Sequence, residues 1–124
     1  MTQVTDPVHA VLAATDELFA ELEPTGPRAG ADRGHPETWT RVLFSSPDGR
    51  TQVGIWQCTP GGWAIVDRPD TETIHVLEGR ARITDADGTA HDLGEGDAIV
   101  LPRGWSGRWD IIETVRKLYV TVAG

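Results

Sequence analysis

The stretch from Glu72 to Gly107 limits the possible folds of this chain most strongly, because glycine and proline divide it into segments of strand length. Gly79 ends VLEG, Gly96 lies in GEGD, and the run AIVLP leads into a corner formed by Pro102 and Gly104. Glycine supplies a positive φ in turns, whereas proline fixes φ and cannot donate to a central ladder. Short strands separated by such turns predict an antiparallel barrel or sandwich.

Alternating polarity supports this all-β interpretation. In RARIT, Ala81 and Ile83 fall on one face of an extended segment, and Arg80, Arg82 and Thr84 fall on the other. Turn signals between the apolar runs then place strands at 39–44, 52–58, 62–67, 72–78, 80–84, 89–93, 97–101, 107–112 and 115–122.

The N-terminal part has a different pattern. Residues 6–22 carry apolar side chains at helical spacing, with Asp6 as a cap and Pro7 at the first helical position, so we expect an α-helix that packs on the barrel or on a second subunit. Residues 23–38 are rich in glycine, proline and charge, which predicts a flexible connector. The expected division is an N-terminal helix and connector (1–38) and a barrel domain (39–124).

Composition excludes several classes of partner. A chain of 124 residues forms one domain, and its formal net charge of -8 argues against nucleic acid and anionic membranes as partners. Cys58 is the single cysteine, which excludes an internal disulfide and fits a reducing cytosol. The first residues, MTQVTDPVHA, lack the basic and apolar regions of a signal peptide, and no apolar run has membrane-spanning length. We therefore expect a cytoplasmic protein.

The turn-rich stretch resembles the cupin motifs. Residues 72–79 match the second half of the first motif, and Gly96, Pro102 and Gly104 match the pattern Gly-x5-Pro-x-Gly of the second. ETIHVLEGRARITDADG, GRWDIIETVRKLYV and the upstream WQCTPGGW are similar to small single-domain, RmlC-like cupins of the DUF861 type. These include the ureidoglycine aminohydrolase cupin domain and the ethanolamine-utilisation cupin. The resemblance covers roughly residues 51–122. It implies a double-stranded β-helix, or jelly-roll barrel, here with an N-terminal α-helix.

The resemblance also implies where a metal would bind. Metal-binding cupins place two histidines and a glutamate from the first motif, and one histidine from the second, around an open site. Glu72 falls on the glutamate position, but residues 65–68 and Gly107 stand where the histidines are expected. We therefore expect no metal site and no cofactor. The resemblance leaves manganese, iron, nickel and zinc open.

A barrel without a metal still encloses a preformed concave site for a small molecule. Among the five tryptophans we expect Trp56 and Trp109 to wall this site and Trp105, in PRGWSG, to lie at its rim. Asp67 and Arg68 are the expected polar residues at its mouth.

Glu72 is the candidate catalytic residue. A carboxylate inside an apolar barrel is costly unless it is paired, so Glu72 is either neutral or paired with Arg68, Arg82 or a ligand cation. A buried carboxyl group suits a general acid or base.

These observations lead to one function and two alternatives. The first is a small-molecule-binding cupin with a degenerate metal site and a ligand in the barrel interior. The main alternative is an enzyme, either a hydrolase resembling ureidoglycine aminohydrolase or a metal-free isomerase or cyclase that uses Glu72. The other alternative is a mainly structural dimer whose barrel is filled by side chains. By analogy with small cupins we expect a homodimer.

Overall fold

The structure is a computed structural model that describes residues 8–124, which form one short helix and nine strands. The strands follow one another along the chain with short connections, as the turn signals predict. The elements are α1 (Thr15–Leu18), β1 (Glu23–Pro27), β2 (Ala31–Gly34), β3 (Glu37–Ser45), β4 (Thr51–Cys58), β5 (Gly61–Ile65), β6 (Asp70–Asp85), β7 (Ala90–Leu93), β8 (Ala98–Leu101) and β9 (Gly107–Ala123).

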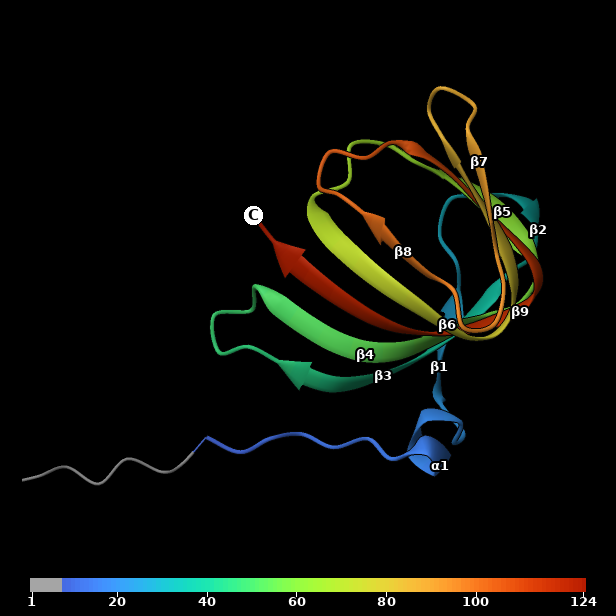
Figure 1. The fold of residues 1–124 in the computed structure, drawn as a ribbon. Coiled ribbons are helices and arrows are strands. Elements are labelled where there is room, and N and C mark those ends of the chain that lie inside the picture. Colours follow the sequence, from blue (N-terminus) through green and yellow to red (C-terminus); the bar gives the residue numbers. More distant parts are fainter. Residues whose placement is uncertain (1–7) are drawn as a thin grey trace, which may run out of the picture.

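All strands pair antiparallel in a single sheet that curls into a barrel (Figure 1). One path through the sheet runs β1-β3-β4-β9-β5-β2, and β6 pairs with β7, β8 and β9. β9 is central because its first half pairs with β5, its second half pairs with β4, and β6 pairs along almost all of it. The expected all-β barrel with an N-terminal α-helix is confirmed, but the helix is much shorter than expected.

β6 and β9 are longer than the sequence predicts, because each joins two expected strands into one. The pairing of β6 with β9 changes register around Gly79, which has a φ of 88°. A Cβ at this position would clash with the backbone oxygen of Thr114. Gly79 therefore marks a bulge that bends a continuous strand.

Side chains of β6 alternate between the two faces as the sequence predicts. Ile74, Ala81 and Ile83 are buried, whereas His75 and Arg82 are exposed. The inward residues meet those of β4, β5, β8 and β9 in one apolar cluster that includes Cys58, Trp63, Leu101, Trp109, Ile111 and Val115.

The helix expected over residues 6–22 is wrong in extent. Only the single turn α1 is helical, and its N-terminal flank has no side-chain cap; Asp6 and Pro7 lie outside the described residues. Val8 and Leu12 are almost fully exposed. Because short helices depend on packing of an apolar face, an unpacked stripe does not hold a long helix. Arg116 on β9 anchors the turn by donating to the carbonyls of Leu18 and Ala20. Within residues 8–124 no helix is long and apolar enough to cross a membrane.

The flexible connector expected over residues 23–38 is also wrong, because this segment supplies β1 and β2. Each pairs on one side only, β1 with β3 and β2 with β5, so both are edge strands. Proline and glycine are tolerated at edges, where a backbone N–H is free of the ladder. Ion pairs from Asp32 and Arg33 to Arg108 and Asp110 further fasten β2 to β9.

Candidate functional site

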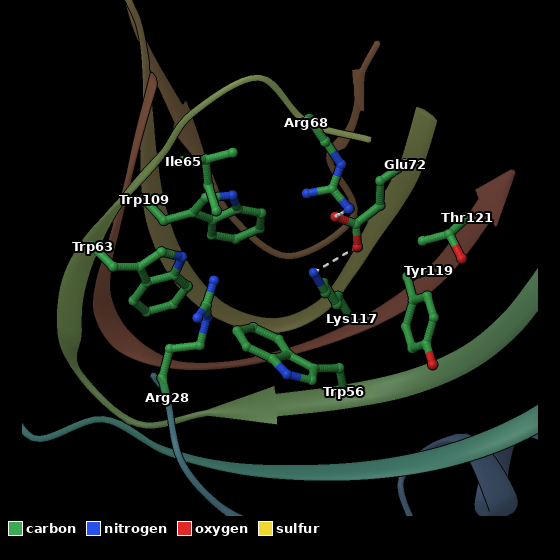
Figure 2. Close-up of a pocket in the computed structure, with 10 residues that line it drawn as sticks. All are labelled: Arg28, Trp56, Trp63, Ile65, Arg68, Glu72, Trp109, Lys117, Tyr119 and Thr121. Carbon is green, nitrogen blue, oxygen red and sulfur yellow. Dashed lines mark hydrogen bonds and ion pairs between the residues drawn. The ribbon is translucent and has the colours of Figure 1, made fainter. Parts of the chain in front are cut away.

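A cavity of about 200 Å³ opens on the inner face of the barrel, between β4, β5, β6 and β9 (Figure 2). Its wall combines aromatic rings with charged groups from distant parts of the chain. The lining residues are Arg28, Trp56, Trp63, Ile65, Arg68, Glu72, Trp109, Lys117, Tyr119 and Thr121.

Strand register produces the aromatic wall. Trp63 on β5 lies directly opposite Trp109 on β9, and their rings stack with centroids 6.0 Å apart and planes 10° apart. Trp56 on β4 presents its edge to both rings at 6.2 and 6.1 Å. These offset and edge contacts are favourable for aromatic groups. Trp63 and Trp109 are 2% and 3% exposed and belong to the apolar cluster, so they form a closely packed wall, whereas Trp56 is half-buried.

Glu72 forms the polar centre of the cavity and is 4% exposed. Its Oε2 accepts a hydrogen bond of 2.8 Å from Nζ of Lys117, and its Oε1 lies 2.9 Å from Nη2 of Arg68. Nε of Arg68 lies 3.0 Å from Oδ1 of Asp70. Two cationic groups thus face one buried carboxylate. Of the partners expected for Glu72, Arg68 is in contact with it, and Lys117 is a further partner.

Lys117 is 5% exposed and lies against three aromatic rings. Its Nζ is 4.3 Å from the ring centroid of Trp56 and 4.6 Å from that of Trp109, with Tyr119 further away at 5.9 Å. Burial lowers the pKa of Lys117 from its ordinary value, while Glu72 opposes this shift. The amine is therefore easier to deprotonate than a surface lysine.

Arg28 reaches the cavity from the connection between β1 and β2. Its guanidinium lies 4.8 Å from the ring centroid of Trp63 and donates to the backbone carbonyl of Ala29. Among residues 8–124 it has no carboxylate partner within ion-pair distance, although burial lowers its pKa from the ordinary value. Arg28 is thus the cationic group available to a ligand (Figure 2).

Four of the six predicted site residues line this cavity: Glu72, Trp56, Trp109 and Arg68. The other two lie elsewhere. Asp67 is exposed, with a φ of 49°, and its backbone N–H donates to Oγ of Ser106.

Trp105 is half-buried, packs against the apolar cluster and donates from Nε1 to Asp85 at 2.8 Å. Arg82, an expected partner of Glu72, instead pairs with Asp92 on the exposed face of β6. Thr73 and His75 lie an odd number of residues from Glu72, so their side chains point to the outside of the barrel. Arg82 lies an even number of residues from Glu72, but it also points outwards because the bulge at Gly79 lies between them.

Sequence reasoning missed several lining residues, above all Lys117 and Arg28. Lys117 has a usable signal, since Val115, Lys117 and Tyr119 alternate at strand spacing and the two neighbours are apolar or aromatic. Arg28 has no such signal, because it lies in a segment of loop-like composition and reaches the cavity only through the pairing of β1 with β3 and of β2 with β5.

The donor set of the cavity does not fit a metal ion. Glu72 is the only carboxylate in the lining, both of its oxygens face cationic nitrogens, and no imidazole is present among the lining residues. His75 is exposed on the outer face, and His91 pairs with Asp85. Among residues 8–124 no three His, Cys, Asp or Glu side chains come together in a cluster. Metal ligation would require displacing Lys117 and Arg68 from Glu72.

Comparisons with known proteins give the same architecture. The fold resembles a protein of unknown function of the DUF861 family from Pseudomonas syringae pv. tomato, with a TM-score of 0.77 and 22% identity over 85% of this chain. This chain spans only 46% of that protein. A putative ethanolamine utilization protein Q from Salmonella typhimurium matches with a TM-score of 0.65 and 20% identity, over 84% of this chain and 98% of that one.

A third similar structure is the polyketide cyclase RemF from Streptomyces resistomycificus, with a TM-score of 0.63 and 24% identity. The match covers 98% of this chain and 81% of that one. These likenesses show the fold alone, and the functions of the neighbours differ. No curated protein gives a match. The family model for the EutQ-like cupin domain matches residues 45–119, which is more than half of the chain. The chain is therefore a small cupin and belongs to the EutQ-like cupin family.

Proposed function

We propose that this cupin binds a small, flat organic anion in the barrel cavity. The observation that carries the proposal is the charge of the cavity wall, which contains three cationic side chains, Arg28, Arg68 and Lys117, and a single carboxylate, that of Glu72. Arg68 and Lys117 are engaged by Glu72, so the guanidinium of Arg28 remains for a ligand.

The aromatic wall favours a flat ligand body. Trp63 and Trp109 stack on each other and are almost fully buried, and the half-buried Trp56 is in edge-to-face contact with both. Stacking on these rings buries apolar area, while a guanidinium–carboxylate contact supplies a charge-assisted hydrogen bond. A planar carboxylate satisfies both requirements at once.

Titration of the intrinsic tryptophan fluorescence with benzoate tests this proposal, because three tryptophans line the cavity. We expect saturable quenching by benzoate and little effect of benzyl alcohol, which has no negative charge. Loss of one charge-assisted contact is worth about 1.5–3 kcal/mol, so Arg28→Gln should weaken benzoate binding by about 10-fold or more.

The matched control is Arg80→Gln, which removes an exposed arginine outside the cavity. Equal binding of benzoate by wild type and Arg28→Gln, or no saturable binding at all, would contradict the proposal.

A second candidate function is metal-free acid/base catalysis on the bound anion, as in an isomerase or cyclase. Glu72 and Lys117 favour it, since their 2.8 Å hydrogen bond brings a carboxyl group and an amine together inside the cavity. The donor set gives no comparable support to a metal-dependent hydrolase. Exchange of the α-hydrogens of pyruvate with D2O, followed by NMR, tests this function. Wild type should accelerate the exchange, and Glu72→Gln should not. If the exchange with wild type is no faster than without protein, acid/base catalysis is refuted.

We also propose that two copies associate through the apolar groove between residues 8–13 and the outer face of β3 and β4. The groove has a volume of about 650 Å³, and two of its lining residues, Leu12 and Phe44, are exposed. A second copy in a two-fold arrangement would cover both apolar surfaces. Light scattering after gel filtration should give a dimer mass, and Phe44→Glu should give a monomer. A monomeric wild type overturns this proposal.

A further inference from the structure

Lys117 is the only lysine of the chain, whereas the other ten basic residues are arginines. It occupies the most buried cationic position of the cavity. Arginine is generally the better residue for a buried ion pair, because its planar group stays charged and makes several hydrogen bonds. Lysine differs in that its amine can lose a proton and then act as a nucleophile. The single lysine therefore lines a cavity in which its amine can react with a bound molecule.

The surroundings of Lys117 match those of a reactive amine. Nζ lies against the faces of Trp56 and Trp109 at 4.3 and 4.6 Å, and Oε2 of Glu72 is 2.8 Å away to accept its proton. Arg68 holds the other oxygen of Glu72 in place. Burial lowers the pKa of the amine, and the charge of Arg68 adds to this effect. Desolvation in an apolar pocket is an established way to activate a lysine.

We propose that Lys117 forms an imine with an aldehyde or ketone that also carries a carboxylate. The inference rests on the proposed function, since the same cavity binds the anion and Arg28 holds its carboxylate. It adds a covalent step and narrows the ligand class to oxo acids.

The step balances without a further reagent. The ammonium passes one proton to Glu72, and the free amine attacks the carbonyl carbon, so that the C=O π pair moves to oxygen. Glu72 relays protons from nitrogen to that oxygen, which leaves as water while the nitrogen lone pair forms the C=N bond. Of the three ammonium hydrogens, two leave in water and one stays on the iminium. Glu72 returns to a carboxylate.

The cavity also stabilises the product. An iminium carries the same positive charge as the ammonium it replaces, so the carboxylate of Glu72 and the faces of Trp56 and Trp109 favour both. An imine of an aryl aldehyde is a flat conjugated system, which packs favourably against the aromatic wall. Figure 2 shows Arg28 and Lys117 pointing into the same cavity from different sides, as a ligand with two functional ends requires.

Reductive trapping tests the inference. Wild type is incubated with 4-formylbenzoate and sodium cyanoborohydride, which reduces an imine to a stable amine by adding hydride. The intact mass of the protein should increase by the mass of 4-formylbenzoic acid minus the mass of one oxygen atom. Peptide mapping should place the adduct on Lys117. Because the chain has one lysine, the N-terminal amine is the only other amine, and mapping separates the two without any variant. Excess benzoate should suppress the Lys117 adduct at least 10-fold.

Variants sharpen the result. Lys117→Met should abolish the internal adduct, and Glu72→Gln should slow trapping at least 10-fold. Glu113→Gln removes an exposed carboxylate paired with Arg80 and should not slow trapping. Saturable benzoate binding with an adduct on the N-terminal amine alone overturns the covalent inference and leaves the proposed function standing. Absence of both benzoate binding and the Lys117 adduct overturns both.

Discussion

The buried pair of Glu72 and Lys117 gives the sharpest test of the structure. Glu72→Gln keeps the shape of the side chain and removes its charge, which leaves the ammonium of Lys117 in the barrel without a carboxylate. Lys117 is 5% exposed, so water does not replace the lost partner. Lys117→Met is the complementary change. It leaves Glu72 with the guanidinium of Arg68 at 2.9 Å and fills the space beside Trp56 with an apolar side chain.

The two substitutions should therefore differ in cost. Breaking a buried ion pair by removing one partner costs about 3–5 kcal/mol. For Glu72→Gln we expect a loss of about 3 kcal/mol at pH 7, because the rings of Trp56 and Trp109 still stabilise the cation and its pKa is already lowered. For Lys117→Met we expect about 1–2 kcal/mol, since Glu72 retains a cationic neighbour.

Urea unfolding at pH 7, followed by tryptophan fluorescence, measures both free energies of unfolding, and the double variant completes a cycle. The coupling should be favourable, so that the double variant is more stable than the sum of the single changes predicts. Glu113→Gln breaks an exposed pair with Arg80 and serves as the matched control. If Glu72→Gln costs no more than Glu113→Gln, or less than Lys117→Met, the electrostatic account of the cavity is refuted.

Two further predictions concern the barrel around the cavity. Burial raises the pKa of the Cys58 thiol to about 11 from 9.0. Because the unfolded chain loses this proton first, the contribution to stability is complete below pH 9 and declines as pH rises towards 11. Between pH 8 and 11 the free energy of unfolding of wild type should fall by about 1–3 kcal/mol more than that of Cys58→Ala, and parallel curves would contradict this. Gly79→Ala should cost about 2 kcal/mol or more in urea unfolding, because its Cβ meets the backbone of Thr114, whereas Gly88→Ala has open space and should cost less; equal costs would contradict a tight bulge.

Local patterns predicted much of the barrel. Turn residues such as Gly79 and Gly96 have positive φ values in the structure, and the alternation of Ala81 and Ile83 gives the buried face correctly. Such patterns suffice because, in a strand with one buried face, buried and exposed side chains alternate with a period of two residues. The position of Glu72 inside the barrel came instead from its match to the glutamate position of the first cupin motif.

The N-terminal segment shows where local patterns fail. Helical spacing over residues 6–22 gave only the single turn α1, because Val8 and Leu12 at the start of the apolar stripe remain exposed. Loop-like composition over residues 23–38 was outweighed by edge pairing with β3 and β5. Propensity is a weak preference that tertiary contacts override.

The sequence by itself determined the all-β barrel, the inward position of Glu72 and the two tryptophans Trp56 and Trp109 near it. Only the tertiary structure decided which side chains contact Glu72. Lys117 lies 45 positions further along the chain, opposite Trp56, and Arg28 enters from a separate edge strand connection. Pairings between distant strands set these contacts, and no local spacing encodes them, because the register of β9 between β4 and β6 is fixed only when the whole sheet closes.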